Sequence, residues 1–481
     1  MKKIKYTIFS IITFLFLISS VYAASTIIDA VSVTYSTTKS GGSSSNVQGA
    51  IDELYQKISN VDNICSANVS KPVIKTGLIP VVISDDGTVT VVSESDSTWY
   101  DYCNKKWANA VIVSSGTYTV GNTIPEANIE SYFVWIPKYK YKLWNVESTQ
   151  TSPSVTKIRN SIDIIFDTTN TTDSSNSCVT PMTSGGTGNC SNGKYMTHPA
   201  FISMGTNGFW AGKFETGYKG ASSVSAAQVN SSDSSKIIVK PNSYSWRYNT
   251  VMNMFIASYN YKRSDNEELN LNSHMMKNTE WGAVAYLSHS KYGIDNEVNI
   301  NNNSNYITGR SSILSVQQGT YPGAYGNPTT DNAAYNTNIG YLASTTGNIS
   351  GIYDMSGGAH EYVASYSAVG SSGFSTTTIG NYDAKYFDQY NSASGETTYQ
   401  YRILGDATGE MGPFWDYKDG DANTRHHNSW YGDHSYFVQS SYPWFHRGGY
   451  YYGGVLAGQF YFGRYTGGVH AGIGFRLVLA P

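Results

Sequence analysis

The sequence contains little charge, few cysteines and hardly any long apolar runs. Charged residues make up 14% of the 481 positions, and the formal net charge is −3. Nucleic-acid-binding surfaces carry clusters of Lys and Arg, so this composition argues against a nucleic-acid partner. No cysteine follows Cys190. No Gly-x-Ser-x-Gly motif is present either, so the chain lacks the sequence pattern of a hydrolase nucleophile elbow.

The one long apolar run lies near the N-terminus. Three lysines among the first five residues precede the apolar stretch Ile8–Ile18, and Val21-Tyr22-Ala23 stands where a small-residue cleavage site belongs. This order is typical of a secretory signal peptide, and the run is shorter than the roughly 20 residues of a membrane span. We expect residues 1–24 to be a signal peptide and the mature protein to be secreted or displayed on a bacterial surface, with a phage-encoded origin left open. An uncleaved anchor is the alternative.

The four cysteines predict disulfide bonds. An even number of cysteines in an exported chain indicates two disulfides, for which three pairings exist. Proximity along the chain favours the pairs Cys178–Cys190 and Cys65–Cys103. None of these residues has a Cys-x-x-Cys or His-x3–5-His partner, so we do not expect a zinc site.

Residues 25–62 are interpreted as a linker followed by a short helix. Asn46 is a suitable N-cap, and the apolar residues after it are spaced by four, three and four positions. They are Val47, Ile51, Leu54 and Ile58. A stripe of less than two heptads is marginal alone, so residues 46–58 pack either on their own chain or in a homo-oligomer. Residues 46–54 resemble short segments of phage tail-fibre-like and bacterial surface proteins.

Residues 63–125 predict a small β-rich spacer without chemistry of its own. Apolar stretches at 78–83 and 89–92 flank an Asp-Gly pair at residues 86–87, which is a β-hairpin signal. Residues 107–113 predict a further strand. The spacer would end at residue 125.

Residues 126–481 contain segments typical of strands and of helices, separated by polar loops. A stretch rich in Ser, Thr and Asn at 150–195 is interpreted as a low-complexity surface insertion. Apolar residues between 252 and 259 have helical spacing, and residues 278–286 predict a second helix.

The last fifty residues have an unusual composition. The segment from Trp430 to His470 contains fourteen aromatic residues, nine glycines and three charged residues. So many glycines exclude an amphipathic helix and favour short strands and tight turns. Loops rich in Tyr and Gly build rigid contact surfaces in antibody paratopes, so this segment is a candidate binding face. A β core that is rich in tyrosine is the alternative.

Several motifs between residue 130 and the C-terminus occur in an order that one family shares. They are Phe133-Val134-Trp135-Ile136-Pro137, His198-Pro199-Ala200-Phe201, Gly208–Glu215, Asn278–Leu287, Gly351–Glu361, Arg447-Gly448-Gly449, Ala457-Gly458-x-Phe460 and Gly474-Phe475-Arg476. The order resembles domains of the formylglycine-generating-enzyme (sulfatase-modifying-factor) type, which have a C-type-lectin-like fold. It also resembles the variable proteins of diversity-generating retroelements. The resemblance to these two groups implies that residues 126–481 form one large, irregular and loop-rich domain of the α+β class. The resemblance to the retroelement proteins also implies that the residues between Tyr450 and Gly472 are diversified.

The same resemblance implies which cofactors to expect. The copper-dependent oxidases of the family bind Cu(I) through a C-terminal cysteine pair, which this chain lacks, so we expect no enzyme and no required cofactor. Members often hold structural calcium, for which Glu361 is the candidate ligand here. Gly358 stands where the family has Asn, which removes one oxygen ligand.

The resulting hypothesis is an exported protein that binds an unknown protein or glycan. The candidate ligand-binding residues are Trp444, His446, Tyr450, Tyr451, Tyr452, Tyr461, Arg464, Tyr465 and His470. Arg447 and Arg476 are expected to be buried or half-buried scaffold residues. A structural, tail-fibre-like component is the alternative function, and a formylglycine-generating enzyme is the disfavoured one.

Overall fold

The computed structural model describes nine stretches of the chain, to which all statements below refer. They are residues 47–53, 68–142, 161–168, 194–263, 271–313, 332–369, 379–392, 402–408 and 429–481. The chain divides into two units, Met1–Ile64 and Cys65–Pro481. Residues 47–53 of the first unit are helical, as predicted. The signal peptide, Leu54 and Ile58 lie outside the described residues, so the oligomer seam stays a prediction.

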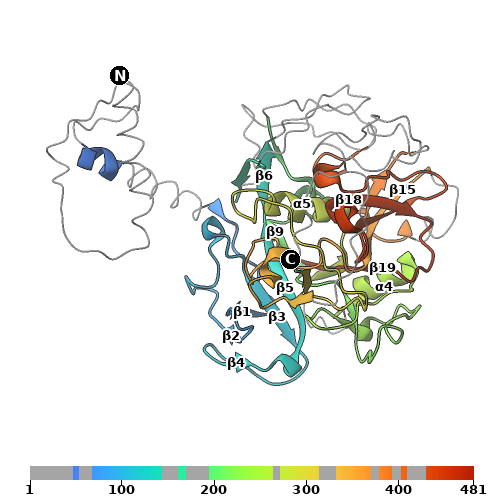
Figure 1. The fold of residues 1–481 in the computed structure, drawn as a ribbon, viewed down its shortest axis with the longest axis horizontal. Helices are drawn as coiled ribbons and strands as arrows, with labels where there is room; N and C mark the ends of the chain where they lie inside the picture. The colour runs from blue at the N-terminus through green and yellow to red at the C-terminus, as the bar shows by residue number, and fades with distance from the viewer. Residues whose placement is uncertain are drawn as a thin grey trace. The chain divides into compact units, whose positions relative to one another are not determined.

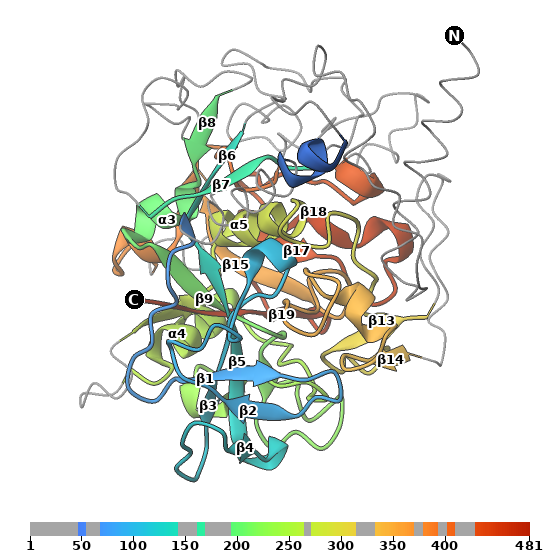
Figure 2. The ribbon, with the colours of Figure 1, turned by 90° about the vertical axis from the view of Figure 1, so that its left-hand side faces the viewer.

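An eight-stranded sheet is the framework of the second unit (Figures 1 and 2). Its strands in spatial order are β12 (Asn272–Met275), β20 (Leu477–Ala480), β9 (Gly208–Gly212), β5 (Ile129–Pro137), β3 (Asn109–Val113), β1 (Ile79–Ile83), β2 (Val89–Val91) and β4 (Thr123–Ile124). All nine residues of β5 are buried, which explains why its apolar residues form a continuous run rather than an alternating pattern. The C-terminal strand β20 inserts between β12 and β9, so the chain end completes the sheet.

The predicted spacer is part of this sheet, and the boundary expected at residue 125 is therefore wrong. Strand β3 pairs with β5 in antiparallel register from Asn109↔Val134 to Val113↔Ile129. A few short strands are marginally stable as an isolated unit. Pairing with β5 makes them part of the larger sheet. The predicted hairpin is confirmed, because β1 and β2 pair across the Asp-Gly turn.

The two predicted helices are confirmed. Helix α4 (Val251–Asn260) is capped by Thr250, whose Oγ1 accepts the Asn253 N–H at 3.2 Å. Every residue of helix α5 (Asn278–Ser288) is buried, and Glu280 accepts the Lys277 N–H at 2.9 Å. A carboxylate at that position satisfies a free N–H of the first turn. A third helix, α3, spans Pro199–Met204. None of the helices in the described stretches is long and apolar enough to cross a membrane.

A second, five-stranded sheet holds most of the aromatic C-terminal segment. It consists of β16 (Asp388–Tyr390), β15 (His360–Ser367), β17 (Trp444–Gly448) and β18 (Gly458–Tyr465), with β19 (Ile473–Phe475) paired to β15. Figure 1 shows β15, β18 and β19 on the right-hand side, away from β1, β2 and β4.

Smaller elements complete the fold. Three small sheets contain β6 (Tyr139–Lys142), β7 (Ile164–Phe166) and β8 (Tyr195–Thr197), then β10 (Gly217–Tyr218) and β11 (Ile237–Ile238), and finally β13 (Arg310–Ser312) and β14 (Asn332–Ala334). One-turn 3-10 helices are η3 (Tyr102–Asn104), η4 (Glu126–Asn128), η5 (Ser234–Lys236), η6 (Gly340–Ala343), η7 (Ala384–Tyr386), η9 (Trp430–Gly432) and η10 (Gly454–Leu456). The architecture is thus mixed and loop-rich, with few helices and several sheets, which agrees with an α+β class.

Two sequence predictions are tested only in part. The described residues of the predicted insertion include β7, where Ile164 and Phe166 are buried, so this stretch is not a surface loop. Strand β7 pairs with β6 in antiparallel register, which fixes these residues in the fold. Cys103 is disulfide-bonded. The cysteines at 65, 178 and 190 lie outside the described residues, so the pairing stays a prediction.

Candidate functional site

Two fully buried arginines hold the C-terminal segment in place. Arg447 on β17 donates from Nη1 to Asn278 Oδ1 at 2.7 Å and to the Asp406 carbonyl at 2.8 Å. Arg476 donates from Nε to Glu361 Oε2 at 3.0 Å and from Nη1 to the Gly212 carbonyl at 2.9 Å. Both side chains are 0% exposed, which confirms the predicted burial of these two arginines.

Glu361 is the partner of Arg476. Both carboxylate oxygens of Glu361 accept from this guanidinium, so a calcium ion would have to compete with the ion pair. Burial raises the pKa of Glu361 to about 7 despite Arg476. A Cβ at Gly358 would overlap the Glu215 carboxylate, so there is no room for a side-chain ligand at this position. Among the described residues, no group of three or more His, Cys, Asp or Glu is arranged to hold a metal.

Three of the predicted ligand-binding residues are buried. Trp444 is 0%, His446 7% and Tyr461 8% exposed, so their assignment to the binding face is wrong. The hairpin of β17 and β18 is covered on the side that these side chains occupy. Trp444 packs on Tyr366 with ring centroids 5.1 Å apart, and His446 packs on His360 at 4.6 Å.

The three consecutive tyrosines lie in a turn rather than on a strand. Strand β17 ends at Gly448, and Gly448 and Gly449 have φ values of +81° and +78°. A Cβ at Gly449 would lie 2.5 Å from the Ala457 Cβ, so only glycine fits this close approach. The turn leaves Tyr450, Tyr451 and Tyr452 all half-buried, in place of the alternation that a strand would impose.

Seven aromatic side chains form a surface that we call the aromatic band. They are Tyr248, Tyr306, Tyr450, Tyr451, Tyr452, Tyr465 and His470, all half-buried or exposed. Tyr450 and Tyr451 lie edge to face at 5.5 Å, and Tyr451 meets Tyr306 at 5.0 Å. Tyr465 meets His470 at 5.2 Å, and the Tyr248 N–H donates to the His470 carbonyl at 3.1 Å. Edge-to-face pairs of this kind fix ring orientations.

Sequence reasoning missed Tyr248 and Tyr306. Each is a single tyrosine in a loop more than 140 residues before Tyr450, among 40 tyrosines in the chain, so no local pattern marks them. Arg247, which is 1% exposed, lies with its guanidinium 3.8 Å from the centre of the Tyr306 ring. This cation–π contact holds the inner face of the Tyr306 ring against the buried Arg247.

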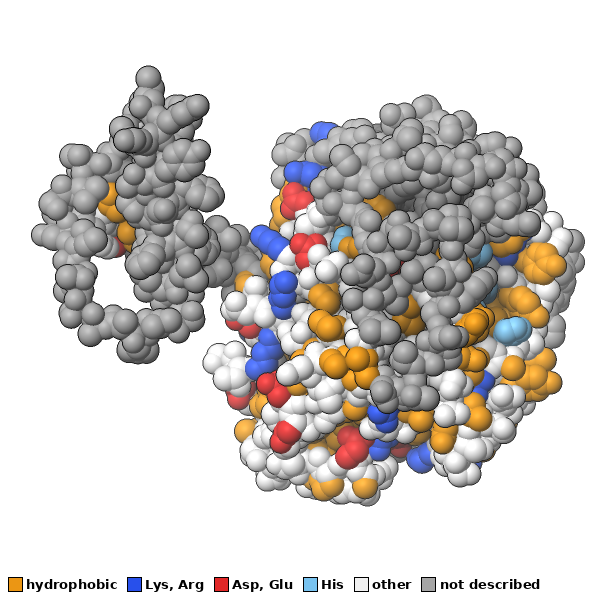
Figure 3. All heavy atoms as spheres, in the orientation of Figure 1, with side chains coloured by type: hydrophobic (Ala, Val, Ile, Leu, Met, Phe, Trp, Pro, Cys, Tyr) orange, Lys and Arg blue, Asp and Glu red, His pale blue; other side chains and the backbone are white. Residues whose placement is uncertain are grey.

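Arg464 belongs to the edge of this region but is partly a scaffold residue. Its guanidinium lies 3.4 Å from the centre of the Tyr436 ring and donates to the Phe437 carbonyl at 3.1 Å. The side chain is half-buried. Figure 3 shows orange hydrophobic and pale-blue histidine side chains beside each other on the right-hand side, where Figure 1 places the C-terminal strands.

Imidazole rings support the band from beneath. The centre of the His360 ring lies within 5.2 Å of the ring centres of both Tyr450 and Tyr461. The His434 ring stacks on Tyr461 with ring centres 5.2 Å apart. The Nδ1 atoms of His360 and His446 are buried without a hydrogen-bond partner. Burial and the neighbouring histidines hold the pKa of His360 well below its ordinary value, and burial lowers that of His446 to about 3. These rings are therefore neutral at physiological pH.

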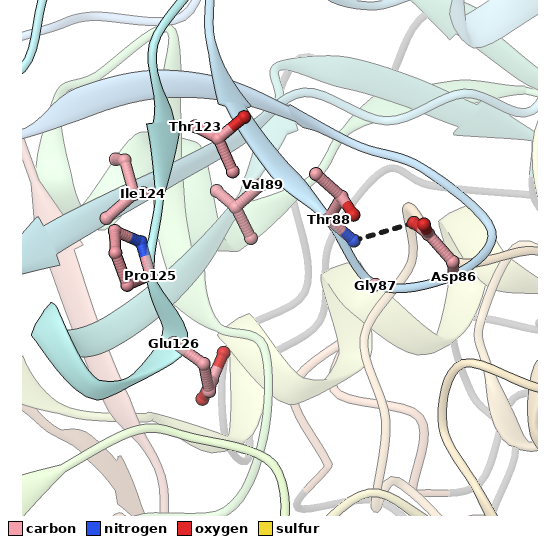
Figure 4. A pocket seen from close by; sticks show the side chains of 8 residues that line it. All are labelled: Asp86, Gly87, Thr88, Val89, Thr123, Ile124, Pro125 and Glu126. Atoms are coloured by element: carbon pink, nitrogen blue, oxygen red, sulfur yellow. Dashed lines mark hydrogen bonds between the residues drawn. The ribbon is translucent and has the colours of Figure 1, made fainter.

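A small pocket of about 250 Å³ lies elsewhere, beside the β1–β2 turn (Figure 4). It is lined by Asp86–Val89 and Thr123–Glu126 and contains none of the predicted site residues. The Asp86 carboxylate accepts the Thr88 N–H at 2.9 Å, and this bond and others from Thr88 and Ser84 lower the pKa of Asp86. Asp86 thus stabilises the turn, and the pocket offers no further convergent chemistry.

Comparison with known proteins leaves the aromatic band as the main guide to function. No protein-family model matches the chain, and no curated protein matches it either.

Proposed function

We propose that this protein is an exported binding protein whose aromatic band contacts a protein or glycan ligand. The observation that carries the proposal is the gathering of seven partly exposed aromatic side chains from four separate chain segments. Tyrosine combines a large apolar ring with a hydroxyl and loses little conformational entropy, so it suits a contact surface. Beneath the band, Arg247 is buried, bonded to the Val224 and Ala471 carbonyls and stacked on the Tyr306 ring, so it positions that ring.

We further propose a C-type-lectin-like domain of the formylglycine-generating-enzyme type without catalytic activity. The ordered motifs support this assignment, and the burial of Arg447 and Arg476 agrees with the scaffold role that the resemblance implies. The lack of a cysteine after Cys190 argues against the copper oxidase chemistry of that family. Diversification between Tyr450 and Gly472 would follow if the gene lies beside a reverse transcriptase and an adenine-mutated template copy.

Binding can be tested by screening the purified protein against a glycan array and a display library of polypeptides. For any ligand found, Tyr451→Ala and Tyr465→Ala should each weaken binding by about tenfold or more, since partly exposed tyrosines are frequent hot spots. Ile202→Ala is the matched control, because Ile202 is 54% exposed on α3, outside the band. If both tyrosine variants keep full affinity, the ligand site lies elsewhere.

A further inference from the structure

His470 directs one ring nitrogen to its own chain and the other to the surface. Its Nδ1 accepts the Gly472 N–H at 3.1 Å, so in the neutral ring the hydrogen is on Nε2. Within the described residues Nε2 has no hydrogen-bond partner and is not enclosed, so it reaches solvent. Burial lowers the pKa of His470, which keeps the ring neutral at neutral pH. The ring therefore presents a hydrogen-bond donor, and no acceptor, to the surface.

The surrounding contacts fix the direction of this donor. The Tyr248 N–H donates to the His470 carbonyl at 3.1 Å, and Arg247 donates from Nη1 to the carbonyl of Ala471. The Tyr465 ring meets the imidazole edge to face, with ring centres 5.2 Å apart. Together with the internal bond to Nδ1, these contacts hold both the backbone and the ring before any ligand binds.

The hydroxyl of Tyr306 lies beside His470, across Gly472. A Cβ at Gly472 would lie 3.4 Å from both Tyr306 Oη and His470 Cε1. The Tyr306 ring is itself fixed, because the Arg247 guanidinium lies 3.8 Å from its centre and the Tyr451 ring meets it at 5.0 Å. Its hydroxyl also has no hydrogen-bond partner among the described residues and reaches solvent. Unlike the imidazole N–H, it can donate or accept.

The position of this donor in an aromatic surface determines what a ligand must supply. A ligand that covers the band removes water from the Nε2–H of His470, and a donor left without a partner is unfavourable. An oxygen acceptor on the ligand removes this penalty, whereas an ammonium or an apolar group does not. Sugar hydroxyls and peptide carbonyls both supply such an oxygen.

We propose that His470 is the specificity-determining hydrogen-bond donor of the aromatic band and that it binds an oxygen acceptor of the ligand beside the Tyr306 hydroxyl. This inference rests on the proposed function of the band and names the ligand group that this part of the band recognises. Because the donor is fixed before binding, little conformational entropy is lost when the ligand binds.

The test compares the full chain with its variants for two probes, the strongest binder of the glycan array and the strongest peptide of the display library. In His470→Asn the amide oxygen lies as far from the backbone as Nδ1 and can still accept the Gly472 N–H, but nothing replaces Nε2. This variant should bind about tenfold more weakly or worse at an unchanged melting temperature. In His470→Gln the longer amide restores a donor near Nε2, so its affinity should stay within about threefold of the native value.

Three further measurements complete the design. Tyr306→Phe removes the hydroxyl but keeps the ring on Arg247, so it should weaken binding by about threefold. Tyr100→Phe is its matched control, because Tyr100 is half-buried and lies outside the band, beside η3. Independently of any ligand, long-range proton–nitrogen NMR spectra should show the Nε2–H tautomer of His470.

The outcomes separate this donor from the band as a whole, for which Tyr451→Ala is the reference. Full affinity in His470→Asn with loss in Tyr451→Ala refutes the donor role but retains the band, and full affinity in both refutes both. A lower melting temperature in His470→Asn, with no recovery in His470→Gln, makes His470 a scaffold residue. An Nδ1–H tautomer also overturns the proposal. A loss seen with the glycan assigns the acceptor to a sugar hydroxyl, and one seen with the peptide assigns it to a carbonyl.

Discussion

The buried arginine scaffold and the aromatic band lie on the same C-terminal segment but follow opposite rules. Around Arg447 and Arg476, polar groups are buried and mostly paired, and the side chains are 0% exposed. In the band, side chains such as Tyr451 and Tyr465 contact one another at ring edges and leave part of each ring exposed. Substitutions in the scaffold should therefore act on folding, whereas substitutions in the band should act on binding.

The largest effect is expected for Arg476→Met. This change leaves the carboxyl of Glu361 buried without its cation, and breaking one side of a buried pair costs about 3–5 kcal/mol. Urea denaturation measures the free energy of unfolding. The double variant Arg476→Met/Glu361→Gln should recover part of the loss, because it removes the unpaired charge. An unchanged unfolding midpoint in the single variant would contradict the scaffold role.

Lowering the pH should reduce the contribution of the buried imidazole of His446 to the free energy of unfolding. His446 has a folded pKa of about 3, below its unfolded value of about 6.5. Its contribution to stability is therefore present above pH 6.5 and falls by about 1.4 kcal/mol per pH unit below it, or about 2–3 kcal/mol at pH 4.5.

The contribution of His446 has to be separated from that of buried carboxyl groups. Glu361 has a raised folded pKa of about 7, so its contribution changes in the opposite direction and grows as the pH falls from 7 toward 4.5. The informative quantity is the difference in unfolding free energy between the native protein and His446→Gln from pH 7 to pH 4.5. If this difference does not change with pH, His446 is not a buried neutral ring.

A smaller effect is expected for Gly463→Ala on β18. A Cβ there would lie 2.5 Å from Cε1 of His446, so the ring beneath the band would have to shift, at a cost of about 1–3 kcal/mol. Gly468→Ala is the matched control, because its nearest neighbour is the Thr466 hydroxyl at 3.3 Å. Equal melting temperatures of the two variants would show that His446 is loosely packed.

Local features of the sequence predicted local structure well. The β1–β2 hairpin, α4 and α5 depend on residues within a few positions of each other, so spacing and turn residues were sufficient. The spacer boundary failed because the pairing of β3 with β5 is a tertiary contact that the composition of residues 63–125 does not encode.

The candidate site was predicted only in part, for the same physical reason. The band residues at 450–452, 465 and 470 follow from the local richness in tyrosine and glycine. Whether Trp444, His446 or Tyr461 faces outward depends on partners from β15, such as Tyr366 and His360, that no pattern within the segment specifies. Tyr248 joins the band through a bond to residue 470, more than 200 positions away.

The smallest effect on folding is expected for Tyr465→Ala, and it separates the band from the core most directly. Tyr461 and Tyr465 are four positions apart on β18, so a regular strand would direct them to the same face. Tyr461 is nonetheless 8% exposed and enclosed by three histidines, whereas Tyr465 is half-buried and contacts His470. Truncating Tyr465 should lower the unfolding free energy by less than about 1 kcal/mol, as expected for a partly exposed side chain. Tyr461→Ala serves as the reference for a buried ring, and urea denaturation of both variants compares them. If Tyr465→Ala destabilises the protein as strongly as Tyr461→Ala, the tyrosines of this segment are a core and the band is not a binding face.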